Sequence, residues 1–210
     1  MYQAERVFFD QYRQRINDSP ALKTSVSEAI GVTLERYNTT VWENRFIVGG
    51  VIEQIIGASA RAVGLTVENA GKSNQGYDLE IQNDPTIGIS VKGVFASVNG
   101  KHNLVNFRGE GNAEDPTSRW NTATMFVMSG VGIGYTDPEF GGQYLHVTSD
   151  ALQISGKGLQ EWWIANPDRL IEIEIPGKPT GPAIRVASDP VSFDVLQDYP
   201  NLIPHWRAEI

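Results

Sequence analysis

The chain has 210 residues, of which 40% are hydrophobic and 20% charged, and its formal net charge is −8. This balance is typical of a globular protein and excludes a wholly disordered chain. Because the chain contains no cysteine, disulfide scaffolds, cysteine nucleophiles and cysteine-ligated metal centres are excluded. The acidity argues against general binding of nucleic acid, since phosphates need neutralising cations.

Neither a targeting segment nor a membrane span is expected. The N-terminal residues mix charged and apolar side chains, unlike a signal peptide. The longest apolar run, residues 46–52, is far too short to cross a bilayer. We therefore expect a cytoplasmic protein with no membrane association.

Three helices are predicted in the first third of the chain, over residues 2–16, 21–36 and 42–63. Their apolar residues recur at the three- and four-residue spacing of one helix face. The third helix is the clearest, and Gly64 follows it in the position where a glycine commonly ends a helix.

After Gly64 the pattern becomes that of strands. Alternating or continuous apolar runs predict strands at 65–69, 77–82, 87–94, 124–133, 143–147 and 170–175. A long polar stretch covers 97–122, and residues 149–150 are expected to cap a short helix. A further helix is expected over 157–165, and the tail from 176 has the proline and glycine content of irregular chain. Helices followed by a mostly β core indicate an α/β or α+β domain.

The strands 77–82 and 87–94 form a predicted hairpin, because a strong turn signal occupies residues 83–86. Alternation puts Tyr77, Leu79 and Ile81 on one face of the first strand. The polar residues of that strand, Asp78 and Glu80, then lie on the other face.

The second strand of the hairpin places Ser90 and Lys92 opposite its own apolar face. If the turn centres near residues 84–85, Asp78 lies across from Lys92 and Glu80 across from Ser90. Such partners are about 5 Å apart at Cβ. One face of the hairpin would then collect two carboxylates, a hydroxyl and an amine.

This set of side chains suits metal-assisted hydrolysis of a phosphodiester. Carboxylates are hard ligands for Mg²⁺, which lowers the pKa of a bound water, and a lysine beside it orients that water or neutralises developing charge. The alternative is an exposed strand face whose ion pairs each contribute little to stability.

Asp78, followed twelve residues later by Ser90-Val91-Lys92, resembles the signature of the PD-(D/E)XK nuclease superfamily, which includes type II restriction endonucleases. The resemblance implies a mixed central β-sheet flanked by helices. It also implies a metal-binding aspartate at the start of the second core strand, a catalytic tripeptide on the third, and often a glutamate on the preceding helix. Glu53 matches that last position, amid the glycines 49, 50 and 57.

Ser90 stands where the superfamily has an acidic residue, so another carboxylate must complete the metal site. Glu80 is the first candidate, and Glu53 and Glu110 are the others. The resemblance thus implies catalytic roles for Asp78, Lys92, Ser90 and Glu53, with Mg²⁺ held by Asp78, Glu53 and Glu80. If none of these carboxylates reaches the metal, the fold could only bind.

Contacts with DNA are predicted for the polar stretch after the hairpin. Arginine pairs with guanine and asparagine with adenine at base edges, so the candidates are Lys101, Asn103, Arg108 and Arg119. The alternative is a glycine-rich surface loop. A second group of basic residues could form a dimer surface or a clamp: Arg6, Arg13, Arg15 and Lys23.

The resemblance implies a magnesium-dependent, sequence-specific endonuclease that acts on double-stranded DNA as a homodimer. We expect a single nuclease domain over 1–210, with an N-terminal helical segment (1–41), a catalytic core (42–135) and a C-terminal extension (136–210). Three alternatives stay open: a structure-selective nuclease of the junction-resolvase or repair type, a non-catalytic DNA-binding module of the same fold, and an unrelated acidic α/β protein.

Overall fold

The computed structural model describes residues 1–37, 39, 44–70, 76–95, 98–104, 120–148, 151–177 and 191–206. The described α-helices are α1 (Gln3–Asn17), α2 (Pro20–Arg36), α3 (Asn44–Ala62), α4 (Pro138–Gly141), α5 (Gly156–Ala165) and α6 (Val191–Leu196). None of them is both long and apolar enough to span a lipid bilayer.

The ends of the first three helices follow from identifiable residues. Pro20 occupies the first turn of α2, where its missing N–H is not needed. At the end of α3, Gly64 adopts a φ of 76°, and its N–H bonds to the carbonyl of Arg61 at 2.8 Å. The N–H of Leu65 reaches back to Ala60 at 3.0 Å, so the last carbonyls of the helix are satisfied.

The strands of the described residues form two sheets. The larger sheet has the order β1-β2-β3-β5-β6-β9, with β1 (Val67–Asn69), β2 (Leu79–Ile81), β3 (Gly88–Val94), β5 (Ala123–Met128), β6 (Gly132–Thr136) and β9 (Leu170–Ile171). The smaller sheet has the order β4-β8-β7, with β4 (Lys101–Asn103), β7 (Leu145–Thr148) and β8 (Ala151–Ser155). The larger sheet is mixed, because β3 and β5 run parallel while its other pairs are antiparallel.

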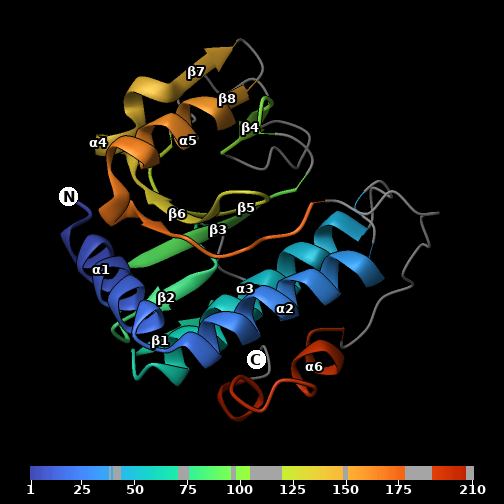
Figure 1. Cartoon of the computed structure of the whole chain (residues 1–210). Coiled ribbons are helices and arrows are strands. Elements are labelled where there is room, and N and C mark those ends of the chain that lie inside the picture. The colour runs from blue at the N-terminus through green and yellow to red at the C-terminus, as the bar shows by residue number, and fades with distance from the viewer. Residues whose placement is uncertain are drawn as a thin grey trace, which may run out of the picture.

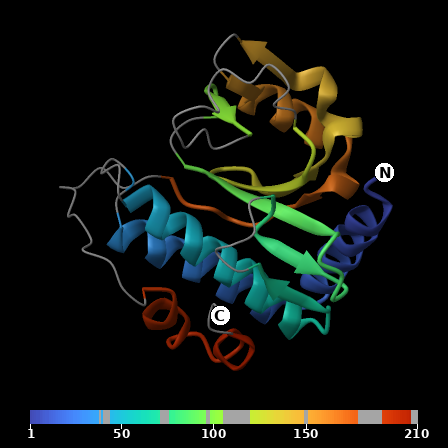
Figure 2. The ribbon, with the colours of Figure 1, turned by 180° about the vertical axis from the view of Figure 1, so that it is seen from behind.

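The two faces of the larger sheet are covered by different elements, as Figures 1 and 2 show from opposite sides. One face packs on α1, α2 and α3 through a large hydrophobic cluster that includes Leu79, Val91 and Met125. The other face packs on α5 and the smaller sheet through a second cluster that includes Phe126 and Trp163. The protein is therefore a mixed α/β fold with helices on both sides of a six-stranded sheet.

Three sequence predictions about the second half of the chain differ from the structure. The apolar run 124–133 forms two antiparallel strands, β5 and β6, because Gly130 (φ 72°) and Gly132 (φ 130°) reverse the chain between them. Residues 149–150 lie outside the described residues, but β8 rather than a helix follows them. The predicted strand 170–175 pairs only at β9.

Candidate functional site

Asp78 lies immediately before β2, the second strand of the sheet in chain order. Its Oδ2 accepts hydrogen bonds from the Ser90 hydroxyl at 2.8 Å and from the Val91 N–H at 2.6 Å, both on β3. At the start of β2, the Asp78 carboxylate thus accepts the Val91 N–H of β3 in place of a backbone carbonyl. Within the described residues, Oδ1 of the same carboxylate accepts no hydrogen bond.

Tyr77, the residue before Asp78, packs across the hairpin in a way that the sequence pattern did not predict. A Cβ on Gly88 would lie 2.2 Å from the Tyr77 ring, so this ring covers Gly88. The Tyr77 hydroxyl donates to the carbonyl of Pro85 in the turn, at 2.6 Å. Gly88 pairs with Glu80, so the Tyr77 ring lies on the polar face, and the prediction that Tyr77 shares the apolar face of Leu79 was wrong.

The hairpin register differs by two residues from the predicted one. Leu79 pairs with Ile89 and Glu80 with Gly88, which puts Asp78 opposite Ser90. The predicted pairs Asp78–Lys92 and Glu80–Ser90 were therefore wrong. Because side chains alternate with a period of two, a shift of two residues keeps every side chain on its predicted face. Asp78, Glu80, Ser90 and Lys92 therefore still form one polar row.

Lys92 lies two residues beyond Ser90 on β3 and therefore on the same face as Asp78. Its side chain is half-buried, and within the described residues its amine forms no hydrogen bond and no ion pair. Glu80 is likewise half-buried and has no such partner within that part of the chain. Within the described residues, one amine and one carboxylate on the face of Asp78 thus have no partner.

A third carboxylate on this face was missed from the sequence. Glu68 of β1 pairs directly with Glu80 of β2, so the two side chains point to the same side. The signal was present, because Glu68 is the single acidic residue in the predicted strand 65–69. Only the pairing of β1 with β2 places it at the site.

Glu53 lies on α3, which packs against the opposite face of the sheet. Gly57, one turn later, allows close approach, since its Cβ would lie 2.8 Å from Oδ1 of Asn69. Of the three glycines around Glu53, only Gly57 has the predicted role, because a Cβ on Gly49 would meet only the Glu53 carboxylate at 4.0 Å and one on Gly50 nothing within 4 Å. The metal role of Glu53 stays a prediction.

The described part of the chain contains no group of three or more histidine, aspartate or glutamate side chains that could hold a metal ion. Mg²⁺ usually takes only one or two carboxylates and completes its shell with water and phosphate oxygens. Asp78 and Glu80 offer hard oxygen ligands, and two residues along a strand separate them by about 6–7 Å at Cα. The donor set therefore fits such an ion bound together with a phosphate.

The predicted DNA-contacting residues are described only in part. Lys101 and Asn103 lie on β4 with exposed side chains. Arg108, Arg119 and the alternative ligand Glu110 fall outside the described residues.

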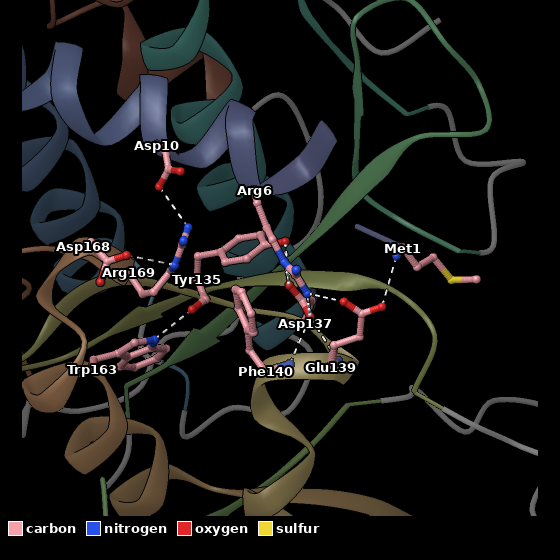
Figure 3. A network of polar contacts seen from close by, with 10 residues as sticks. All are labelled: Met1, Arg6, Asp10, Tyr135, Asp137, Glu139, Phe140, Trp163, Asp168 and Arg169. Carbon is pink, nitrogen blue, oxygen red and sulfur yellow. Dashed lines mark hydrogen bonds and ion pairs between the residues drawn. The ribbon is translucent and has the colours of Figure 1, made fainter. Parts of the chain in front are cut away.

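A second charge network, built from residues other than those of this polar face, holds α1 to the sheet (Figure 3). The Arg6 guanidinium donates to both carboxylate oxygens of Asp137 at 2.8 Å and to Glu139 at 2.5 Å. It also lies 3.6 Å from the centre of the Phe140 ring. In the same network, Arg169 donates to Asp10 at 2.9 Å.

Asp137 is fully buried yet ionised. Burial would raise the pKa of its carboxyl, but hydrogen bonds from Arg6 and the Phe140 N–H, with the Arg6 charge, hold that pKa below its ordinary value. Arg6 is therefore a structural residue, and Arg15 likewise donates to the carbonyls of Val63 and Gly64. These contacts weaken the hypothesis of a basic clamp on the N-terminal helix.

No family model matches the chain, and neither the curated proteins nor the solved structures give a match. The polar face of β2 and β3 is therefore the basis for assigning a function.

Proposed function

We propose that the protein is a magnesium-dependent endonuclease of double-stranded DNA with a restriction-endonuclease-like fold, acting as a homodimer. One observation carries the proposal. Asp78 is anchored to β3 through one carboxylate oxygen, while its second oxygen and the Lys92 amine, on the same face, have no partner within the described residues.

The order of the elements supports the same proposal. α3 precedes the sheet, Asp78 stands at the start of β2, and Ser90 and Lys92 lie on β3. β5 then pairs with β3 in parallel after a long connection. This is the helix, strand, hairpin and strand order that the resemblance implies.

The proposed residues have separate roles at the phosphate. Asp78 and Glu80 would hold the Mg²⁺ ion, which supplies charge stabilisation and a water of lowered pKa. Ser90 and the Val91 N–H keep the Asp78 carboxylate in one orientation. Lys92 orients the attacking water and offsets the charge that develops on the phosphate oxygens. Two copies related by a twofold axis would cut both strands of a palindromic site.

The test is cleavage of plasmid and linear duplex DNA with Mg²⁺ by the wild-type protein, Asp78→Ala and Lys92→Ala. We expect Lys92→Ala to lower the cleavage rate by about 10²–10⁴-fold, the usual contribution of a positioned proton-transfer group. Asp78→Ala should lower the cleavage rate by at least the same factor. Lys157→Ala and Asp198→Ala, which alter exposed charges elsewhere, are matched controls and should cleave normally.

Metal binding is measured separately by the thermal unfolding of the protein with and without Mg²⁺. We expect Mg²⁺ to raise the midpoint of thermal unfolding of the wild type and to leave that of Asp78→Ala unchanged. Equal cleavage by wild type and both variants would remove the site assignment. Binding of DNA without cleavage by the wild type would favour the non-catalytic module, and preference for branched DNA the structure-selective nuclease.

A further inference from the structure

The smaller sheet is fixed to the face of the larger sheet that carries Asp78, Ser90 and Lys92. Phe126 of β5 is the paired neighbour of Lys92 and lies on the same face. It shares one hydrophobic cluster with Leu152 and Ile154 of β8. The polar row and the smaller sheet therefore belong to one side of the molecule.

The three strands of the smaller sheet contain no acidic residue, although the chain carries a net charge of −8. The single formal charge on them is that of Lys101, whose side chain is exposed. On β8, Leu152 and Ile154 point inward to the cluster, so Gln153 points outward. The outer face of the smaller sheet, which includes Lys101, Asn103 and Gln153, can therefore approach a polyanion without repulsion from acidic residues of its own strands.

Two amide side chains on this outer face hold each other across the strands. Asn103 of β4 pairs with Gln153 of β8, and the Gln153 Nε2 donates to the Asn103 Oδ1 at 3.0 Å. Within the described residues, the Asn103 amide nitrogen and the Gln153 amide oxygen have no other partner. The pair therefore leaves the Asn103 amide nitrogen as a donor and the Gln153 amide oxygen as an acceptor, in an orientation that the cross-strand bond restricts.

We propose that the outer face of β4 and β8 reads duplex DNA in the major groove, with Asn103 and Gln153 recognising an adenine. This inference rests on the proposed nuclease function and adds Gln153 as a specificity-determining residue. Adenine offers an acceptor (N7) and a donor (N6) in that groove, which match the free donor and acceptor of the pair. Strand ribbons fit the major groove of DNA, whereas that of duplex RNA is too narrow. Lys101, two residues from Asn103, is placed for a phosphate.

The inference is tested with a library of DNA duplexes randomised at every position, incubated with the protein and Mg²⁺. Bound and cleaved molecules are sequenced separately for wild type, Asn103→Ala, Gln153→Ala and Lys101→Ala. Gln11→Ala, an exposed glutamine on α1, is the matched control, and thermal unfolding confirms that each variant folds.

We expect the wild type to select a sequence with a required adenine. Gln153→Ala and Asn103→Ala should each weaken that one preference by about 5- to 150-fold and leave the other positions unchanged. Lys101→Ala should weaken binding to all sequences and reduce the salt dependence by about one ion.

If Gln153→Ala and Asn103→Ala select the same sequence as the wild type, the inference is overturned and the nuclease proposal stands. If the wild type cleaves DNA without any base preference, the inference is likewise overturned and the nuclease proposal stands. A wild type that neither retains nor cleaves DNA overturns the nuclease proposal itself, and this inference with it.

Discussion

Replacing Arg6 by methionine removes the charge that compensates the buried Asp137 while keeping most of the side-chain volume. Asp137 is fully buried, and the Arg6 side chain is only 15% exposed. Removing one member of a buried ion pair costs about 3–5 kcal/mol, because the remaining charge is left without its partner.

Other donors reduce this cost at Asp137. The Tyr135 hydroxyl and the N–H groups of Glu139 and Phe140 still reach its carboxylate, at 3.0–3.1 Å. We therefore expect Arg6→Met to lose about 2–3 kcal/mol of unfolding free energy, which is less than the full cost of removing one member of a buried ion pair. For a chain of this length the loss corresponds to a fall in Tm of about 4–12 °C.

The assay is thermal and urea unfolding of wild type and Arg6→Met at pH 7, with Arg169→Met as control. Arg169 pairs with Asp10, which is 46% exposed, so its replacement should cost less than about 1 kcal/mol. Because the pKa of Asp137 is lowered in the fold, its contribution is complete above about pH 4 and is lost as the pH falls through the folded pKa. Equal losses for both variants at pH 7 would refute the reasoning.

Three further predictions concern packing and the site. Gly134→Ala would place a Cβ 2.2 Å from the Trp163 ring and should cost about 1–3 kcal/mol in urea unfolding, whereas Gly142→Ala meets nothing within 4 Å and should be neutral; equal effects would contradict this. Tyr12→Phe removes a buried 2.6 Å bond to Ser59 and should cost about 1 kcal/mol, and a more stable variant would count against that bond. Ser90→Ala leaves the Val91 N–H on Asp78 and should lower cleavage less than Asp78→Ala does; an equal loss would assign Ser90 a direct role.

The helical part of the fold was predictable because its signals are local. Pro20 and Gly64 mark helix ends through their own backbone geometry, and the predicted helices 2–16, 21–36 and 42–63 differ from the observed ones by at most two residues at either end. The strands were harder to bound. An apolar run gives no sign of a reversal within it, so only the backbone of Gly130 and Gly132 separates β5 from β6.

The polar face was predictable in its membership but not in its pairing. Alternation alone puts Asp78 with Glu80 and Ser90 with Lys92. The register depends on the turn, where Gln82 and Asn83 both adopt positive φ and the N–H of Ile87 bonds to the Asp84 carbonyl. Neighbours from other strands, such as Glu68 and Gln153, follow only from the long-range pairing of β1 with β2 and of β4 with β8.

The six-stranded sheet divides the apolar side chains into two cores of unequal size, and this division affects how the molecule opens. The core beneath α1, α2 and α3 is much the larger, while that beneath α5 and the smaller sheet is limited. Regions with few buried apolar contacts open locally at lower free energy, so amide hydrogens of β4 and β8 should exchange with solvent before those of α3. The layer proposed to meet DNA is then also the layer that can adjust its shape while the helical layer stays folded.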